Sequence, residues 1–134
     1  VLLEQHVAGR ELAVSVLDGE ALPVVEAVPQ GDRYDFEARY QIGRTAFSCP
    51  APLDDAVTAR AQQIATEATQ VLGCRGASRV DLILDEETGE PTILEIDTVP
   101  GLTETSLLPL AADAAGLDFD ALVARMLATV PLAA

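Results

Sequence analysis

Residues 79–97, RVDLILDEETGEPTILEID, decide the fold of this chain. Two apolar runs, Arg79–Leu84 and Thr92–Asp97, flank the polar segment Asp85–Glu90. Short apolar runs separated by a polar, glycine-containing segment are typical of a β-hairpin. The sequence therefore predicts two antiparallel strands joined by a turn centred on residues 87 and 88.

The register of this hairpin determines which side chains share a face, because successive side chains of a strand point to opposite faces. A shift by one residue would send every side chain to the other face. Pairing about Glu87 and Thr88 places three acidic side chains on one surface. The predicted opposing pairs are Asp81 with Glu95, Arg79 with Asp97, and Ile83 with Ile93.

Carboxylates that face each other repel and weaken a hairpin, by up to about 1 kcal/mol per pair. A divalent cation would offset this repulsion, because Mg²⁺ prefers oxygen ligands and usually takes one or two carboxylates together with substrate phosphates. The hairpin therefore predicts a magnesium site. The alternative is a solvated acidic hairpin in which Arg79 serves as counter-ion.

The segment that follows, TVPGLTETSLLPLAADAAG, is rich in groups that could bind an anion. Pro100 and Gly101 force a turn that can expose backbone N–H groups, which suits an oxyanion. Thr103, Thr105 and Ser106 place hydroxyl groups just before a predicted helix, whose N-terminus favours negative charge. The alternative is ordinary helix capping by Thr105 or Ser106.

The rest of the chain predicts a single α+β unit, an antiparallel sheet with helices packed on one side. Turns are predicted at Ala8-Gly9 and Asp18-Gly19. The spacing of Val57, Ala61, Ile64, Ala68 and Val71 predicts an amphipathic helix. Strands are predicted over residues 1–6, 11–17 and 21–28, helices over residues 54–72, 106–115 and 119–130, and a loop over residues 41–52.

The composition limits the possible partners. The chain of 134 residues has 22 acidic and 8 basic residues, a net charge of −14, and every basic residue is arginine. Such a surface repels nucleic acids and anionic membranes, so neither is expected as a partner. Cys49 and Cys74 lack metal-ligand spacing and predict free thiols in a reducing compartment, hence a cytoplasmic location. The opening VLLEQHV resembles the middle of a strand and predicts a piece of a longer protein.

Two stretches, GCRGASRVDLIL and LEIDTVPGLTETSLLPLAADAAG, resemble the carboxyl-terminal lobe of D-alanine–D-alanine ligases, in the ligase-like branch of the ATP-grasp superfamily. The stretches GRELAVSVL, LPVVEAVP, YDFEARY and CPAPL match in the same order. The resemblance covers essentially residues 1–134 as one lobe. It implies that the enzyme's amino-terminal domain and the first part of its central domain are absent.

The resemblance assigns roles to the acidic hairpin and the turn after it. Asp81, Glu95 and Asp97 match the metal ligands, with Glu95 bridging two magnesium ions, for which manganese could substitute. Arg79 matches a catalytic arginine that stabilises the transition state, helped by the backbone N–H of Gly101. Asp97 stands where the family usually has an asparagine, which adds a negative charge to the metal site.

The same resemblance assigns residues to ATP and to the amino acids. Tyr40 matches an active-site tyrosine on a mobile loop. Arg39 stands where the family commonly has a lysine near the phosphates, and it keeps the charge while changing the geometry. The remaining matches are Glu4 to the adenine amino group, Val7 to the adenine ring, Glu11 to the ribose, and Ser106 with Leu107 to the carboxylate of the second amino acid.

The implied activity is ATP-dependent ligation of two D-alanine molecules through an acyl phosphate, for cell-wall peptidoglycan synthesis. The parent enzyme is expected to be a homodimer, and this chain alone is expected to be inactive. Asp97 keeps open a sibling ligase that uses D-lactate or the amino acids of secondary metabolism. A non-catalytic nucleotide-binding module is the other alternative.

Overall fold

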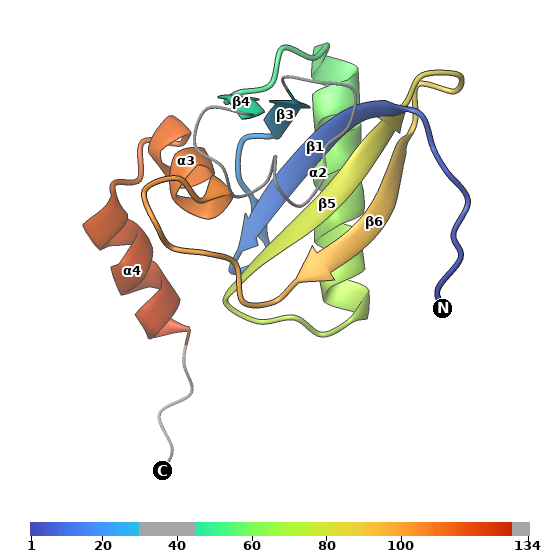
Figure 1. Ribbon diagram of the computed structural model, residues 1–134. Coiled ribbons are helices and arrows are strands. Elements are labelled where there is room, and N and C mark those ends of the chain that lie inside the picture. The colour runs from blue at the N-terminus through green and yellow to red at the C-terminus, as the bar shows by residue number, and fades with distance from the viewer. Residues whose placement is uncertain (30–44, 130–134) are drawn as a thin grey trace.

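The computed structural model describes residues 1–29 and 45–129, which form one antiparallel sheet with helices packed against it (Figure 1). The strand order is β4-β3-β1-β5-β6, and β2 pairs with β1. The α+β class and the antiparallel sheet are thus confirmed. The strands are β1 Gly9–Leu17, β2 Glu20–Ala21, β3 Val25–Pro29, β4 Thr45–Ser48, β5 Ala77–Asp85 and β6 Pro91–Asp97, and the helices are α2 Asp55–Val71, α3 Leu107–Ala114 and α4 Phe119–Ala128.

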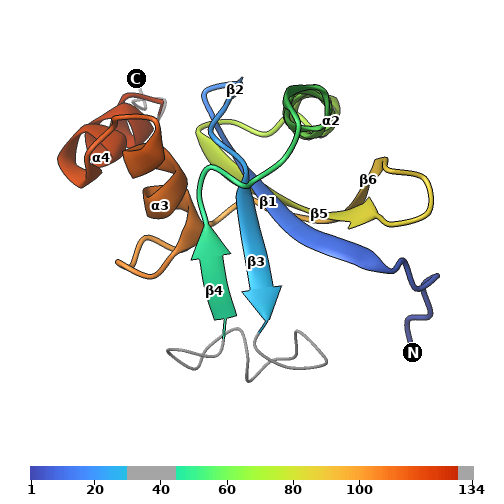
Figure 2. The same cartoon turned by 90° about the horizontal axis from the view of Figure 1, so that it is seen from above.

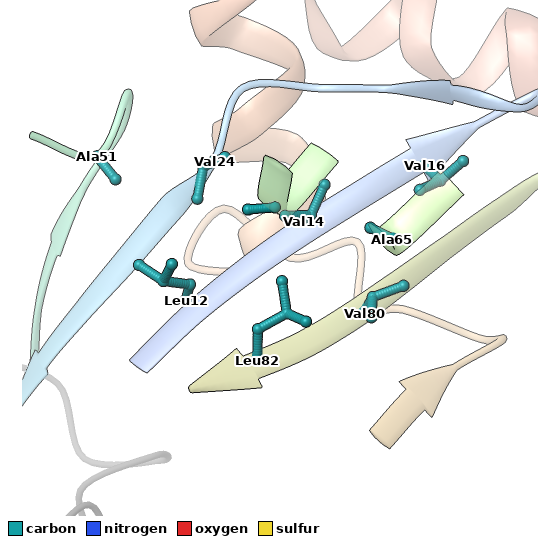
Figure 3. Packing of buried hydrophobic residues seen from close by; sticks show 9 residues of the cluster. Leu12, Val14, Val16, Val24, Ala51, Ala65, Val80 and Leu82 are labelled. Carbon is teal, nitrogen blue, oxygen red and sulfur yellow. The ribbon is translucent and has the colours of Figure 1, made fainter. Parts of the chain in front are cut away.

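Alternate residues of the central strand β1 belong to two different hydrophobic clusters. Leu12, Val14 and Val16 pack with Ala61 and Ala65 of α2 (Figure 3). Residues of β1 at odd positions point the other way, because side chains alternate along a strand. The second cluster joins Ala13 and Leu17 of β1 to Leu108, Ala111 and Ala112 of α3 and Leu122 of α4.

The helices therefore cover both faces of the sheet, and the prediction that they pack on one side is wrong. Figure 2 shows α2 well apart from the pair α3 and α4. Both faces of β1 are apolar along most of its length, from Leu12 to Leu17. Such a strand stabilises the fold only if each face is covered. Among the described residues, no helix is long and apolar enough to cross a membrane.

The turn at Asp18-Gly19 is confirmed. Its two residues have φ angles of 56° and 80°, and Leu17 pairs with Glu20 across it. Positive φ at both central positions is the type I′ geometry that suits the twist of a two-residue hairpin.

The predicted strand over residues 1–6 and the turn at Ala8-Gly9 are both wrong. Residues 1–8 form no strand, and Leu2 and Leu3 are exposed. Gly9 instead begins β1 and pairs with Asp85 of β5. A Cβ at Gly9 would lie 2.0 Å from the carbonyl oxygen of Leu84, so the close approach of the two strands requires glycine here.

Other element boundaries also differ from the sequence prediction. The strand predicted over residues 21–28 is divided into β2 and β3, with Pro23, which has no N–H to donate, between them. Residues 45–48, predicted as loop, form the edge strand β4. The predicted helices are confirmed with slightly narrower bounds, and Gly73 and Gly116 lie just beyond α2 and α3 with φ angles of 66° and 78°.

Candidate functional site

The β5–β6 hairpin has the predicted register over its acidic half. Asp81 lies opposite Glu95, and Arg79 lies opposite Asp97. The register then shifts, because Leu82 pairs with Ile93 and leaves Leu94 as an extra residue in β6. Bulges of this kind bend a strand and change the direction of its side chains. Leu94 and Glu95 consequently both line the same cleft, although they are adjacent in the chain.

The bulge also makes one predicted pair wrong. Ile83 lies opposite Thr92 and not opposite Ile93. The hydrophobic pattern alone did not reveal this shift, because Leu82, Ile83 and Leu84 are all apolar and fit either register.

A cleft of about 690 Å³ opens on the sheet face that carries Arg79 and Asp81. It brings together every predicted site residue in the described part of the chain except Val7. Arg39 and Tyr40 lie outside the described residues. The predicted residues that line the cleft are Glu4, Glu11, Arg79, Asp81, Glu95, Asp97, Gly101, Ser106 and Leu107.

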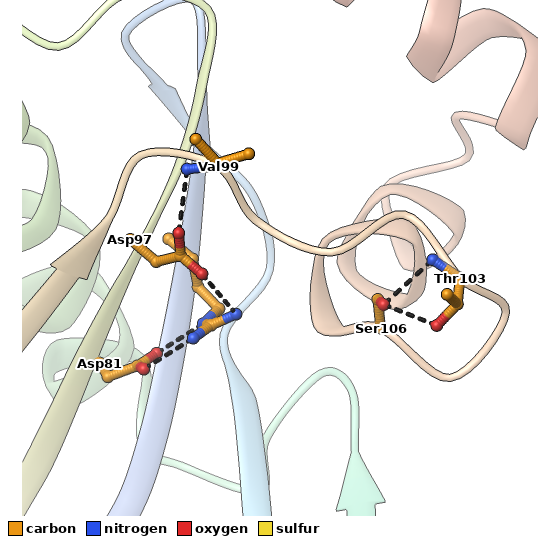
Figure 4. A network of polar contacts seen from close by, with 6 residues as sticks. Asp81, Asp97, Val99, Thr103 and Ser106 are labelled. Carbon is orange, nitrogen blue, oxygen red and sulfur yellow. Dashed lines mark hydrogen bonds and ion pairs between the residues drawn. The ribbon is translucent and has the colours of Figure 1, made fainter. Parts of the chain in front are cut away.

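Arg79 lines this cleft and contacts both Asp81 and Asp97, the two carboxylates labelled in Figure 4. Its Nε lies 2.7 Å from Oδ1 of Asp81 and its Nη2 lies 2.9 Å from Oδ2, a two-pronged contact. Its Nη1 lies 3.4 Å from Oδ2 of Asp97. The hydrogen bonds to Asp81 are the main cause of the raised pKa of Arg79, and the charges of Asp81, Asp97 and Glu95 add to it. Arg79 therefore stays cationic.

Asp97 has a second contact that holds it at the start of the next loop. The backbone N–H of Val99 donates to Oδ1 of Asp97 at 2.9 Å. One carboxylate oxygen thus faces Arg79 while the other orders the chain that leaves β6 (Figure 4).

The acidic side chains have the oxygen chemistry that Mg²⁺ prefers, and all three line the cleft. In residues 1–29 and 45–129, however, no group of three or more His, Cys, Asp or Glu side chains is arranged to hold a metal ion. The guanidinium of Arg79 contacts Asp81 and Asp97 instead. The donor set fits a hard cation, whereas the three-carboxylate cluster expected from the hairpin is not assembled.

The loop after β6 forms one wall of the cleft through Gly101, Thr103, Thr105 and Ser106. Ser106 occupies the N-cap position of α3, but its side chain makes no capping hydrogen bond. Its Oγ accepts instead from the backbone N–H of Thr103 at 3.1 Å, and it lies 2.8 Å from Thr103 Oγ1 (Figure 4). Ser106 is thus the N-cap residue by position, as the capping alternative predicted, but its side chain does not cap the helix, and Pro109 three residues on has no N–H to donate.

Sequence reasoning missed the apolar part of the cleft. Phe47, Leu94 and Val99 line it and are partly or largely exposed. Phe47 was missed because its segment was predicted as loop, and Leu94 because the bulge redirects it. An exposed apolar residue in a polar context was the available signal.

Sequence reasoning also missed an ion pair between β1 and β3. Arg10 Nε lies 2.6 Å from Glu26 Oε1, Nη2 lies 2.8 Å from Oε2, and Nη2 also donates to the carbonyl of Pro52 at 3.1 Å. The hydrogen bond to Glu26 is the main cause of the raised pKa of Arg10. This pair ties two strands to the segment before α2 and does not line the cleft.

Comparisons with known proteins are consistent with this arrangement. The model of the family described as "D-ala D-ala ligase C-terminus" matches residues 1–128. The D-alanine–D-alanine ligase of Syntrophotalea carbinolica is 46% identical over 132 residues, which cover 98% of this chain and 43% of the relative. That of Alcanivorax borkumensis is 48% identical over 127 residues, or 95% of this chain and 41% of the relative. This chain therefore spans less than half the length of these relatives.

Solved structures have the same fold. The D-alanine–D-alanine ligase of Bacillus anthracis superposes with a TM-score of 0.80 at 29% identity, covering 94% of this chain and 40% of that one. A structure of that ligase complexed with ATP gives a TM-score of 0.79 with 41% of its chain covered. The family match spans nearly the whole chain, and the fold agrees with it, so this chain belongs to the D-alanine–D-alanine ligase carboxyl-terminal family.

Proposed function

We propose that this chain is the ATP- and magnesium-binding part of a D-alanine–D-alanine ligase, which joins two D-alanine molecules at the expense of ATP in peptidoglycan precursor synthesis. The observation that carries this proposal is the cleft. It collects acidic, basic and hydroxyl side chains from β1, β5, β6 and the loop before α3. Ligand sites are typically concave, with a few convergent polar groups on an apolar lining.

The cleft contains separate groups for the two ends of ATP. Glu4 and Glu11 line it from the segment before β1 and from β1 itself. In the proposed enzyme they bind the adenine amino group and the ribose, with Val7 beside the adenine ring. The acidic hairpin serves the phosphates, together with Arg39 and Tyr40, which lie outside the described residues.

In this proposal Asp81, Glu95 and Asp97 hold two magnesium ions, with manganese as a substitute. The bound ions would supply positive charge that offsets the phosphate charges. Asp81 and Asp97 must then share their oxygens with Arg79 or release it, since both contact it. Their position on one face of the hairpin supports this assignment.

Arg79 and the loop before α3 are proposed to act on the reacting groups. The carboxylate of the first D-alanine is phosphorylated by ATP, and the amine of the second then displaces phosphate from the acyl phosphate. Arg79 and the backbone N–H of Gly101 stabilise the negative charge that develops on the oxygens. Ser106 and Leu107 hold the carboxylate of the second D-alanine.

A chimeric enzyme would test this proposal directly. The matching segment of the Syntrophotalea carbinolica ligase, 46% identical to this chain, is replaced by residues 1–134. We expect ATP-dependent formation of D-alanyl-D-alanine, and none from the matched chimera that carries Arg79→Ala. Substitution of D-lactate for the second D-alanine distinguishes the sibling ligase. A folded chimera that hydrolyses ATP without forming either product would contradict the proposed activity.

The isolated chain is proposed to be inactive. In-line phosphoryl transfer requires the reacting groups to be held in place from both sides, and this chain spans 43% of the Syntrophotalea relative. Phosphate release by residues 1–134 with ATP and D-alanine should equal the background without protein. We further propose that the parent enzyme is a cytoplasmic homodimer that binds neither nucleic acid nor membranes, consistent with the net charge of −14.

A further inference from the structure

The hydroxyl groups of Thr103, Thr105 and Ser106 form a short chain of contacts on one wall of the cleft. Thr105 Oγ1 lies 3.3 Å from Thr103 Oγ1, which lies 2.8 Å from Ser106 Oγ. All three residues line the cleft. The contact to Ser106 has the length of a good O–H···O hydrogen bond, and the contact between the two threonines is longer and weaker.

Ser106 is the N-cap residue of α3, but its hydroxyl does not accept a hydrogen bond from the helix. Asp118 at the equivalent position of α4 accepts a hydrogen bond from the backbone N–H of Ala121 at 2.8 Å. Ser106 at the start of α3 has no such donor, because the residue three positions on is Pro109, which lacks an N–H, and its Oγ accepts from the backbone N–H of Thr103. The hydroxyl is thus held by the loop and not by the helix.

The number of lone pairs on a hydroxyl then restricts what Ser106 can do. A serine hydroxyl has one proton and two acceptor lone pairs. The backbone N–H of Thr103 uses one lone pair at 3.1 Å. If the hydroxyl of Thr103 donates to the second, Ser106 can only donate its own proton. Thr103 would in turn accept from Thr105, so that all the hydroxyl groups point in one direction.

The opposite direction, in which Ser106 donates to Thr103, satisfies the same distances within the loop. An anionic oxygen in the cleft can accept a proton but cannot supply one, so it selects the first direction. Arg79 is the only basic side chain among the described residues that line the cleft, and Asp81 and Asp97 already contact it. Neutral donors are therefore the groups available to add a directed hydrogen bond to an anion.

The surrounding backbone leaves little freedom for the Ser106 hydroxyl. A Cβ at Gly101 would lie 2.7 Å from Ser106 Oγ. Gly101 therefore packs against the hydroxyl on one side, while Thr103 holds it through both its backbone and its side chain.

We infer that Thr103 is a positioning residue that makes the Ser106 hydroxyl a hydrogen-bond donor to an anionic oxygen, a carboxylate or a phosphate, in the cleft. This inference rests on the proposed function, because it takes Ser106 as a ligand-binding group. It adds to that function a residue that acts through Ser106, with Thr105 as a weaker second support.

Binding of small anions to the 134-residue chain tests this role. D-alanyl-D-alanine and inorganic phosphate serve as separate probes for a carboxylate and a phosphate, with the dissociation constant taken from amide NMR shifts. Thr103→Val should weaken binding of the preferred probe about tenfold, the effect of one hydrogen bond to a charged group. Thr103→Ser, which keeps the hydroxyl, should restore binding.

A control variant tests whether the loss of a threonine hydroxyl outside the cleft also weakens binding. Thr92→Val removes a hydroxyl from an exposed position of β6 outside the cleft and should leave binding unchanged. If Thr103→Val does not fold, Thr105→Val supplies the test, with an expected two- to threefold weakening because its contact is longer.

The role of Thr103 and the role of Ser106 can be disproved separately. Weaker binding in Ser106→Ala but unchanged binding in Thr103→Val would overturn the role of Thr103 and leave the proposed function intact. Unchanged binding in Ser106→Ala, or binding of neither probe to the original chain, would overturn the role of Ser106 in the proposed function and this inference with it.

Discussion

The guanidinium of Arg79 donates hydrogen bonds to both carboxylate oxygens of Asp81, with Nε 2.7 Å from Oδ1 and Nη2 2.9 Å from Oδ2. The two residues are separated by one position on β5, so their side chains point to the same face. Both side chains are mostly buried, with 13% and 14% of their surface exposed. Removing one partner of a pair buried to this degree costs more than removing one partner of a surface pair, because the other charge is left buried without that partner.

Replacement of Arg79 should therefore destabilise the fold. Arg79→Met removes the guanidinium that contacts both carboxylate oxygens of Asp81 and should lower the free energy of unfolding by about 2 kcal/mol. Arg79→Lys keeps the charge but lacks the planar fork of the guanidinium. Its free energy of unfolding should lie between those of Arg79→Met and the original chain. Urea denaturation at neutral pH measures the difference.

Arg125 offers a matched control for this substitution. Its contact with Glu20 at 3.1 Å is exposed, with 37% and 72% of the two side chains accessible. Arg125→Met should change the free energy of unfolding by less than about 0.5 kcal/mol, since exposed pairs contribute little. Equal losses in the two methionine variants would contradict the importance assigned to the Arg79–Asp81 pair.

Glu95 should matter for catalysis more than for folding. It lies opposite Asp81 on the neighbouring strand, where Glu95→Gln removes a charge and keeps the size of the side chain. In the chimeric ligase, turnover should fall by about a hundredfold or more, because phosphoryl transfer depends on electrostatic stabilisation. The melting temperature should change little or rise slightly, since carboxylate repulsion is relieved.

Turnover and melting of Glu95→Gln should be measured together with those of Glu87→Gln. Glu87 is exposed in the turn of the same hairpin and does not line the cleft, so its variant should keep both activity and stability. Near-normal turnover of Glu95→Gln would remove Glu95 from the mechanism. Lost activity together with a collapsed melting temperature would make it a structural residue.

Asp85 should make the stability of the hairpin depend on pH. The backbone N–H groups of Thr88 and Glu87 donate to its Oδ1, at 3.0 and 2.7 Å, and they lower the pKa of Asp85. A lowered pKa in the folded state contributes stability above the unfolded pKa, and this contribution is lost as the pH falls through the folded pKa.

Asp85→Ala should consequently lower the melting temperature at pH 7. The difference from the original chain should narrow as the pH falls below about 4, the ordinary pKa of an aspartate. Glu87→Ala controls for loss of a negative charge in the same turn. A difference that stays constant down to acid pH would show that the carboxylate charge is not the cause.

Replacement of Ser15 by alanine should stabilise the fold. Its side chain is buried on β1, with 1% of the residue exposed, and its Oγ has no hydrogen-bond partner among residues 1–29 and 45–129. A buried hydroxyl without a partner costs about 1 to 3 kcal/mol, and an apolar group of similar shape avoids this cost. Ser15→Ala should therefore raise the free energy of unfolding by about 1 kcal/mol in urea denaturation. A decrease would indicate that an ordered water satisfies the hydroxyl.

Several elements could be predicted from the sequence because local physics determines them. Asp18-Gly19 tolerates the positive φ angles of its hairpin turn, and apolar residues at helical spacing predict α2. The buried residues of α2 are Ala61, Ala65 and Thr69, however, and Val71 of the predicted stripe is exposed. The opposition of Asp81 and Glu95 follows from strand alternation and a centred turn. The family resemblance then indicated which side chains would gather, and the cleft contains all of them in the described residues except Val7.

Other features depend on contacts between segments far apart in the chain. Residues 1–6 have the composition of a strand but form none, because β-propensity produces a strand only where a partner strand is paired. The helices divide between two faces because both faces of β1 need cover.

The details of the cleft were likewise decided by the tertiary structure. The bulge at Leu94 shifts the register of β6 against β5. Leu94 and Glu95 therefore both line the cleft. The guanidinium of Arg79 can reach several carboxylates, and the packing around it determined that it holds Asp81 in a fork and Asp97 at one edge. Ser106 is the N-cap residue of α3, but Pro109 offers it no N–H, and the fold places the backbone N–H of Thr103 within reach of its hydroxyl. Alternation and turn chemistry act over a few residues and can be deduced from sequence, whereas the choice among competing partners depends on distances that only the folded chain defines.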